Sequence, residues 1–505
     1  MSKNLYKILF DGFNQDTDKV CINIPGQKKW SYKEIDYLSA LFASYLNGLG
    51  LKKGDRIICQ NDKSVFAVGL YLGCLRMGLI YTPLNTSYTM KEVEYFIENI
   101  EPKLFVCSLE NYEEVNQVCK KLGVPNLRAM GVNNEDSFIK EILSFNPYHI
   151  FESCSDNDTA AILFTSGTTG RSKGAMITHG NLSSNARALK EAWSFSSHDT
   201  LLHALPIFHV HGLFVALHTA FLSASEVIFL EKFIIPEVIY NLKKSSVMMG
   251  VPTFYNRLID EKSFTEKIFK RIRLFISGSA PLTEKTFNEF KNITKHSILE
   301  RYGMTETGMI TSNPLHGDRV EGTVGFSLPN IEIRIVKDCK VLPTNEKGIV
   351  QVRGPNVFKG YWKMKEKTKQ EFTEDGFFIT GDIGQIDKDG RLSLSGRSGD
   401  MIISGGFNIY PKEIEILLNA IDGIKESAVI GVKHIDFGEC PIAILVADND
   451  NNLVDEKDIN ASLHGFLAKY KIPKSFIWVK FLPVNAMGKV QKKDLRIKFE
   501  EILLT

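Results

Sequence analysis

The sequence predicts an α/β protein with a large N-terminal domain of helix-covered sheets plus a β-rich subdomain, and a small mobile α+β C-terminal domain. Three observations lead to this prediction. Short apolar strands alternate with helical patterns over residues 1–150, and four later strands end in Gly/Ser/Thr-rich turns. After about residue 320, short strands with hairpin signals replace that pattern. The 505 residues suffice for two to four domains of ~100–200 residues each.

Composition excludes several classes of protein. Lys and Arg number 61 against 59 Asp and Glu, so the net charge of +2 does not fit a strongly basic nucleic-acid binder. Eight scattered cysteines form no CxxC pair, which disfavours a zinc site and a disulfide framework and fits a reducing compartment. The longest apolar run, Val65 to Leu75, is shorter than the ~20 residues of a membrane span, and the N-terminus lacks a signal-peptide core. We therefore expect a cytoplasmic protein that binds neither nucleic acid nor membrane; its oligomeric state stays open.

The first 150 residues predict a mostly parallel sheet. Strands are expected at Arg56–Gln60, Leu79–Thr82 and Lys103–Cys107, and the helix between the first two carries the long apolar run. Alternation of strand and helix favours parallel strands covered by helices.

The middle of the chain repeats one theme, in which an apolar strand runs into a turn and a helix follows. The expected strands are Ala160–Thr165, Val247–Gly250, Arg273–Ser277 and Ile298–Arg301. Pro252, just after the second of them, suits the first position of a helix. Ligands bind at the carboxyl ends of strands in open α/β sheets, so these four ends predict one shared site.

The C-terminal part predicts a hairpin and then a small α+β unit. Strands at 383–387 and 391–395 flank a Lys-Asp-Gly turn. Met401–Ser404 is an expected strand, Gly405-Gly406 a turn, and Pro411 opens a helix that buries Ile414, Leu417, Leu418 and Ile421. We divide the chain into residues 1–396, a hinge at 397–400 and residues 401–505. The glycine-containing stretch at the boundary is equally typical of a plain loop.

The most informative motif is Thr165-Ser-Gly-Thr-Thr-Gly-Arg-Ser-Lys-Gly174. Its glycines allow close backbone approach, and backbone N–H groups in such a turn can surround a phosphate. The hydroxyl groups add donors and Lys173 adds charge, although the spacing is not that of a Walker A loop. A Gly/Ser loop alone is often only a flexible turn, but the hydroxyls, the lysine and the preceding strand favour phosphate binding here. The residues that we assign to it are Thr165, Ser166, Gly167, Thr168, Thr169, Gly170 and Lys173.

Two weaker features have structural alternatives. In Tyr302-Gly-Met-Thr-Glu306, Thr305 can bind phosphate and Glu306 can hold Mg²⁺, or Thr305 can simply cap a helix. Asp382 can accept both hydroxyls of a ribose, with Arg397 across the hairpin, or the two can be a turn aspartate and a surface arginine.

Histidines and a basic turn complete the candidates. His209 and His211 stand two residues apart without a third metal ligand, so pocket or core residues are the better interpretation. The turn Asn485–Lys492 is basic, and such a run is usually a solvated face. Lys489 differs because it follows a glycine on the small domain.

Taken together, these segments resemble the adenylate-forming family of acyl-CoA synthetases, luciferases and peptide-synthetase adenylation domains. The matching stretches are Thr165–Gly174, Tyr302–Glu306, Thr380–Asp382, Gly396–Pro411 and Gly488–Lys489, in the family's order over nearly the whole chain. The resemblance implies that a carboxylate attacks the α-phosphorus of Mg·ATP to give an acyl-adenylate and pyrophosphate, after which coenzyme A displaces AMP.

The resemblance also assigns roles. Residues 165–173 handle the β- and γ-phosphates, Thr305 contacts phosphate, Glu306 organises Mg²⁺, and Asp382 and Arg397 hold the ribose. Tyr302, Ser279 and Ala280 lie by the adenine, and Glu300 and Gly303 join this ATP-binding set. Lys489 matches the mobile catalytic lysine, Asp400 the hinge residue, and Ser404, Gly405, Gly406 and Phe407 the coenzyme A channel. Rotation of the small domain between the two half-reactions is likewise implied.

Within the family, further stretches are similar to the malonyl-CoA synthetases, among them Pro83–Thr89, His203–Phe214, Met248–Tyr255 and Leu274–Leu282. This similarity implies that Arg257 binds the second carboxylate of malonate, with His209, Ser279 and Met304 near the acid and His209 among the catalytic residues. Without it, Arg257 is a helix-surface arginine. A ligase for methylmalonate, oxalate or another short acid, an enzyme that loads a carrier protein, and a nucleotide-binding regulator remain alternatives.

Overall fold

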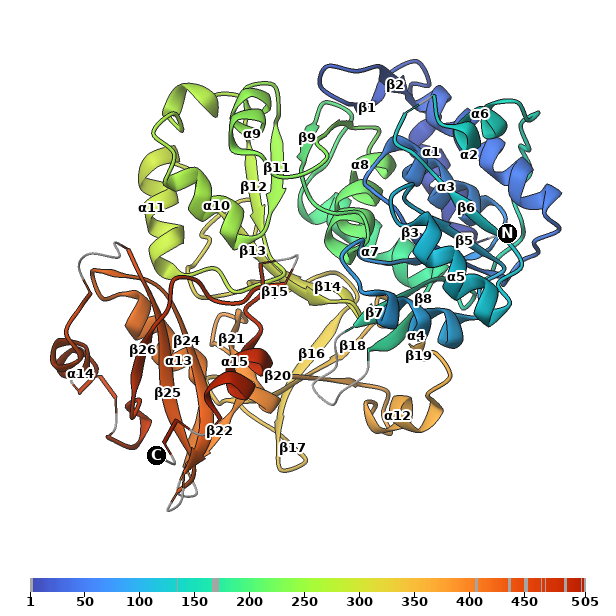
Figure 1. The fold of residues 1–505 in the computed structure, drawn as a ribbon. Helices are drawn as coiled ribbons and strands as arrows, with labels where there is room; N and C mark the ends of the chain where they lie inside the picture. The colour runs from blue at the N-terminus through green and yellow to red at the C-terminus, as the bar shows by residue number, and fades with distance from the viewer. Residues whose placement is uncertain are drawn as a thin grey trace.

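The structure is a computed structural model, and it describes residues 3–133, 135–165, 172–404, 407–434, 437–448, 453–464, 466–467, 469–485, 488–500 and 502–503. Figure 1 shows a large N-terminal part, coloured from blue through yellow to light orange, and a smaller C-terminal part, coloured deeper orange to red, set beside it. The predicted α/β class with a separate α+β unit is confirmed.

Two mixed sheets form most of the large part. The order β19-β8-β7-β4-β3-β5-β6 describes the first, which is parallel from β7 to β6. Its strands are β3 (Arg56–Gln60), β4 (Ile80–Pro83), β5 (Leu104–Cys107), β6 (Leu127–Ala129), β7 (Thr159–Thr165), β8 (Lys173–Thr178) and β19 (Gly360–Tyr361).

The second sheet has the order β15-β14-β13-β12-β11-β9-β10-β1-β2 and is parallel from β13 to β1. Its strands are β1 (Val20–Asn23), β2 (Lys29–Ser31), β9 (Thr200–His203), β10 (Glu226–Phe229), β11 (Val247–Gly250), β12 (Leu274–Ser277), β13 (Leu299–Met304), β14 (Gly308–Ser312) and β15 (Phe326–Ser327).

Helices cover these two sheets. The apolar run predicted as a helix is α3, which is buried along its whole length because it packs against α2. Gly69 and Gly73 allow this contact, since a Cβ atom at either would lie 2.8 Å from Leu38 or Phe42. The helical segments of the large part are α1 (Leu5–Phe13), α2 (Tyr32–Gly48), α3 (Val65–Arg76), α4 (Met90–Ile100), α5 (Tyr112–Leu122), α6 (Ser137–Leu143), α7 (His179–Ala192), the π-helix η1 (His211–Leu217), α8 (His218–Leu222), α9 (Ile235–Leu242), α10 (Pro252–Ile259), η2 (Glu266–Ile268), α11 (Glu284–Thr294) and α12 (Lys365–Gln370).

The β-rich subdomain is an antiparallel sheet in the order β17-β16-β18-β20-β21. It comprises β16 (Glu332–Lys337), β17 (Lys340–Val341), β18 (Gly348–Arg353), β20 (Phe378–Ile386) and β21 (Leu392–Arg397), and the short turn η3 (Ser398–Asp400) follows it. The hairpin predicted around residues 388–390 joins β20 to β21.

The C-terminal unit packs its own core around a third helix-covered sheet, in the order β23-β22-β25-β24 with β26 beside β25. Ile414 and Leu418 are buried there as predicted, and Leu417 and Ile421 pack against that core. The elements are β22 (Ile402–Ser404), β23 (Phe407–Ile409), α13 (Pro411–Asn419), β24 (Ile424–His434), β25 (Gly438–Ala447), α14 (Glu456–His464), η4 (Lys469–Lys471), β26 (Phe476–Trp478) and α15 (Lys492–Phe499).

Two of the four predicted strand–turn–helix units are wrong. The strand that ends at Thr165 returns as the antiparallel strand β8, and α7 begins only at His179. The strand predicted to end at Arg301 continues to Met304 and returns as β14. In both, the second segment pairs its backbone with the first, which a local pattern does not reveal. Thr305 therefore lies in a hairpin turn and caps no helix.

No described helix combines the length and the apolar character that crossing a membrane requires.

Candidate active site

The hairpin β13–β14 and the end of β7 bring Thr165, Glu306 and Lys173 together. The Thr165 hydroxyl donates to Glu306 Oε1 at 3.3 Å, and the hydroxyl of Tyr361 donates to the same oxygen at 3.0 Å. Lys173 Nζ lies 4.6 Å from the centre of the Tyr361 ring and 3.7 Å from a carboxylate oxygen of Glu371. Thr165 and Lys173, the two ends of the predicted phosphate-binding loop, therefore lie close to Glu306, the predicted magnesium ligand. Ser166, Gly167, Thr168, Thr169 and Gly170 lie outside the described residues.

Glu306 is a buried carboxyl whose hydrogen-bond partners are neutral hydroxyls. Burial raises its pKa, and the hydrogen bonds from Tyr361 and Thr165 and the charge of Arg397 only partly oppose that shift. A buried carboxylate with this surrounding is well suited to accept a cation. Among the described residues no group of three metal-ligating side chains gathers, so a metal here would need oxygens from a ligand.

The β20–β21 hairpin joins Asp382 and Arg397. They are partners in register and form an ion pair, with Arg397 Nε 2.9 Å from Asp382 Oδ1. The hydroxyl of buried Tyr302 donates to the other Asp382 oxygen, and the backbone N–H of Asp382 donates to Thr380 Oγ1 at 3.0 Å. The negative charge of Asp382 is the main cause of the raised pKa of Arg397. This pairing holds a carboxylate in one orientation beside the Tyr302 ring.

A third group consists of His209 and His211 from the segment after β9, Ser279 from the turn after β12, and Arg301 within β13. His211 donates its backbone N–H to His209 Nδ1 at 3.3 Å, and its own Nδ1 lies 3.2 Å from Ser279 Oγ. Ser279 has φ +72°, a left-handed conformation that is rare for serine. Burial and the charge of Arg301 lower the pKa of His209 to about 4, so His209 is neutral at pH 7.

Arg301 is a functional candidate that the sequence analysis missed. Its guanidinium lies directly against Gly278, where a Cβ atom would be only 2.4 Å from Arg301 Cζ. The side chain is 3% exposed, and its Nε and Nη2 atoms have no hydrogen-bond partner among the described residues. Burial lowers its pKa to about 9. The sequence feature that could have revealed it is a pair of charged residues at the end of the predicted apolar strand Ile298-Leu-Glu-Arg301.

Arg257 is placed differently from this group. It lies on α10 with an exposed side chain, and no hydrogen bond or ion pair to another described residue holds it.

The remaining predicted residues of the large domain lie near the third group in the sequence. Met304 and Gly303 end β13 and are half-buried, and Ala280 follows Ser279 in the turn after β12. Glu300 is buried and accepts the N–H of Leu282 at 3.1 Å; burial raises its pKa to about 7.

The turn that carries Lys489 reaches this site from the small domain. Gly488 lies against Thr253 at the start of α10, where a Cβ atom would be 2.8 Å from Thr253 Oγ1. Partial burial and the nearby charge of Arg397 lower the pKa of Lys489, while Asp382 and Asp400 raise it. The catalytic candidate of the small domain therefore lies in the electrostatic field of the Asp382–Arg397 pair.

The other small-domain candidates are less defined. Ser404 is buried at the end of β22, and its Oγ lies 3.7 Å from Cys440 Sγ. Gly405, Gly406 and the side chain of Phe407 lie outside the part of the chain that the structure describes. Asp400 accepts from Arg496 of α15 at 3.1 Å.

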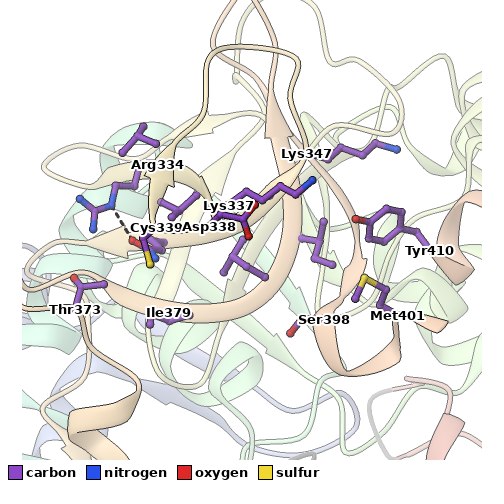
Figure 2. Close-up of a pocket in the computed structure, with 16 residues that line it drawn as sticks. Arg334, Lys337, Asp338, Cys339, Lys347, Thr373, Ile379, Ser398, Met401 and Tyr410 are labelled. Carbon is purple, nitrogen blue, oxygen red and sulfur yellow. Dashed lines mark hydrogen bonds between the residues drawn. The ribbon is translucent and has the colours of Figure 1, made fainter. Parts of the chain in front are cut away.

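A cavity of about 560 Å³ lies between β16, β18 and β20 and the residues Ser398, Met401 and Tyr410 (Figure 2). None of the predicted site residues lines this cavity.

Comparison with known proteins identifies the family of the chain. The AMP-binding enzyme family matches residues 10–362, and the AMP-binding enzyme C-terminal domain matches residues 413–489. A malonate–CoA ligase of Arabidopsis thaliana is 34% identical over 98% of this chain and 89% of its own length. The mitochondrial malonate–CoA ligase ACSF3 of Mus musculus is 34% identical over 92% of this chain and 86% of its own.

Among solved structures, ATP-bound MatB from Rhodopseudomonas palustris is 45% identical, with a TM-score of 0.97 and full coverage of both chains. The apo form of the same protein gives a TM-score of 0.85. By this score the present structure is more similar to the ATP-bound form than to the apo form.

Proposed function

The chain belongs to the AMP-binding enzyme family, and on that premise we propose that it is an ATP-dependent malonate–CoA ligase. It joins malonate to ATP as malonyl-AMP with release of pyrophosphate. It then transfers the malonyl group to the thiol of coenzyme A and releases AMP. The relatives named malonate–CoA ligase, which align over nearly the whole chain, support this substrate.

The observation that carries the proposal is the unpartnered guanidinium of Arg301. Buried donors are almost always satisfied in folded proteins, so one left open beside His209, His211 and Ser279 favours an anionic ligand at this position. His211 adds a second open position, because its Nε2 has no partner among the described residues. Malonate has two carboxylates, and the one that does not react needs a partner when it is buried. A guanidinium can bind it through two parallel hydrogen bonds.

Arg257, the residue that the sequence analysis assigned to that carboxylate, remains a candidate beside Arg301. Its helix α10 borders the site, because Thr253 at its first turn touches Gly488 and Tyr255 lies within the electrostatic reach of Arg301. We propose that the exposed Arg257 attracts the dicarboxylate at the entrance and that Arg301 holds it inside.

The nucleotide roles follow the groups already described. Asp382 would accept the ribose hydroxyls with Arg397 fixing its orientation, and Tyr302, Ser279, Ala280, Glu300 and Gly303 would border the adenine. Thr165, Lys173 and Thr305 would bind phosphate. Mg²⁺ would be held by Glu306 together with phosphate oxygens, which is the usual sharing for magnesium bound with ATP, and it would neutralise phosphate charge during the first half-reaction. Lys489 would bridge the reacting carboxylate and the α-phosphate, where charge grows in the transition state.

The second half-reaction requires the thiol to reach the same carbonyl. We propose that residues 397–400 are the hinge between domains 1–396 and 401–505, with Asp400 as the residue that turns. The matched family regions end before it and resume after it. Ser404–Phe407 would then line the entry of coenzyme A.

The test is coenzyme-A-dependent formation of AMP with malonate, methylmalonate, oxalate, acetate, butyrate and 4-coumarate. Malonate should exceed butyrate by as much as ~10⁴-fold, because a site that pairs a charge rejects an uncharged analogue. A rate of AMP formation with butyrate equal to that with malonate would refute malonate as the substrate, while the assignment to the ligase family would stand. Adenylate formation without transfer to coenzyme A would favour a carrier-protein loading enzyme.

We also infer a reducing compartment, such as the cytoplasm, because none of the eight cysteines forms a disulfide in the structure and seven of them are buried. Cell fractionation with an antibody to the chain tests this inference.

A further inference from the structure

A half-buried lysine and a buried histidine link the two large sheets near the His209–His211 segment. Lys63 lies between β3 and α3, and His203 is the last residue of β9. Lys63 Nζ lies 2.7 Å from His203 Nδ1, 2.9 Å from the His203 carbonyl and 2.5 Å from the Leu230 carbonyl. An ammonium group has three N–H donors, so all of them are used.

The arrangement fixes the protonation of His203. Burial lowers the pKa of Lys63, but a neutral amine would have to accept from His203 Nδ1 and would leave Nε2 without a proton against the Gly212 carbonyl. Lys63 is therefore the donor, His203 Nδ1 accepts, and the single proton of the neutral ring is on Nε2. His203 Nε2 lies 2.9 Å from the carbonyl oxygen of Gly212, which can only accept. Burial and the charge of Lys63 lower the pKa of His203, which agrees with a neutral ring. His203 and Lys63 both pack on the Phe229 ring, which restricts their movement.

Gly212 ends the segment that carries His209 and His211. The chain turns so tightly there that a Cβ atom on Gly212 would lie 2.0 Å from the Pro206 carbonyl oxygen. A hydrogen bond from the His203 ring to the Gly212 carbonyl can therefore hold the whole turn of residues 206–212 in place. His211 in turn meets Ser279, beside the open guanidinium of Arg301.

We propose that Lys63 and His203 are positioning residues for the acid-binding segment: Lys63 fixes the tautomer of His203, and His203 holds the Gly212 carbonyl. Neither touches the substrate. They act by keeping His209 and His211 at the distance that the acid requires. The proposal rests on the proposed function only in that residues 206–212 contact the acid.

The experiment measures pyrophosphate release by full-length variants while the acid and ATP are varied separately, with whichever acid of the panel the wild type uses best. Lys63→Met and His203→Phe should raise the KM for the acid about tenfold, the effect of one lost hydrogen bond to a buried group. The KM for ATP should stay within about twofold, because the Asp382 group is separate. His203→Gln, whose amide can donate to Gly212 and accept from Lys63, should retain most of the wild-type KM.

Tyr71→Phe is the matched control. It removes a buried hydrogen bond, from Tyr71 to His218 Nε2 at 2.9 Å, beyond the other end of η1. It should lower the unfolding temperature without changing the KM for the acid. Equal KM changes in Tyr71→Phe and Lys63→Met, or equal effects of His203→Gln and His203→Phe, would overturn the proposal.

A substrate-free measurement separates this proposal from the proposed function. In ¹⁵N-histidine NMR spectra, one buried histidine of the wild type should be a pure Nε2–H tautomer whose Nδ1 accepts a hydrogen bond, and Lys63→Met should move that Nδ1 signal toward the position of an imidazole nitrogen that accepts none. An unchanged Nδ1 signal would refute the link even if the enzyme is a malonate–CoA ligase. A changed Nδ1 signal in a chain that activates none of the acids would support the link and refute the proposed function.

Discussion

Gly488 of the small domain packs directly on Thr253 of the large domain, so the turn that carries Lys489 rests on the first turn of α10. Gly488 has φ +72°, and a Cβ atom there would lie 2.8 Å from Thr253 Oγ1 and 3.0 Å from its Cγ2. Two ion pairs accompany this contact, Lys285 with Asp448 and Lys425 with Asp260, both at 3.5 Å. Both pairs are exposed and contribute little, so the contact at Gly488 determines how closely Lys489 approaches.

The contact predicts that Gly488→Ala slows the first half-reaction about tenfold or more, because the new methyl group pushes the turn away from Thr253. Thr253→Ala removes both crowded atoms, so the double variant should recover part of the rate. Gly50→Ala is the control for backbone strain alone, since Gly50 has φ +75° and no atom within 4 Å of an added Cβ. The measurement is malonate-dependent pyrophosphate release. A double variant no faster than Gly488→Ala would argue against contact with Thr253.

Lys489→Ala should abolish most adenylate formation and leave thioester formation from supplied malonyl-AMP and coenzyme A. The reason is that its charge is needed where the carboxylate and the α-phosphate react, and loss of such a preorganised donor costs about 3–4 kcal/mol. Separate single-turnover assays of the two steps measure this. Equal loss of both steps would contradict the role.

Arg301→Gln should lower kcat/KM for malonate by about 10²-fold or more and raise the relative rate with butyrate. The variant loses two charge-assisted hydrogen bonds to the distal carboxylate. Arg257→Gln, tested in parallel, should have the smaller effect because its side chain is exposed. Arg319→Gln is the control, since Arg319 is half-buried and already donates to the carbonyls of Pro314, Ser297 and Leu315. An unchanged ratio of malonate to butyrate in Arg301→Gln would assign the carboxylate to another residue.

Asp400→Pro should impair thioester formation more than adenylate formation, because proline fixes φ in the proposed hinge. Asp400→Ala separates this effect from the lost hydrogen bond with Arg496, since it removes the bond and leaves the backbone free. Transfer of the malonyl group from malonyl-AMP to coenzyme A is the assay. A normal transfer rate in Asp400→Pro would place the hinge elsewhere.

The buried histidines predict a loss of stability as the pH falls. Burial lowers the pKa of His218 to about 3, against about 6.5 in the unfolded chain. The unfolded state therefore binds one more proton between these values, and stability decreases as the pH falls below about 6.5. His218→Gln should flatten this dependence by up to about 1.4 kcal/mol per pH unit. Unfolding midpoints in urea between pH 5 and 7 measure the slope, and parallel slopes in variant and wild type would exclude His218 as a contributor.

Local patterns were sufficient for much of this fold. Val247–Gly250 followed by Pro252, and Pro411 followed by Ile414 and Leu418, were predicted correctly because strand spacing, helix spacing and proline each act within a few residues. The hairpins after Thr165 and Met304 were not predicted, because a returning strand is specified by its pairing partner and not by its own sequence.

The sequence by itself determined the family, the α/β class and most candidate residues, because the motifs at 165–174, 302–306 and 380–382 are contiguous and each carries its chemistry in a few neighbouring side chains. Only the tertiary structure decided which side chains are left without a partner. Arg301 became a candidate because Gly278 lets its guanidinium lie buried, and Lys63 because its ammonium group contacts His203 at the end of β9. Burial and hydrogen-bond satisfaction depend on residues that are distant in the sequence, so no local pattern contains them.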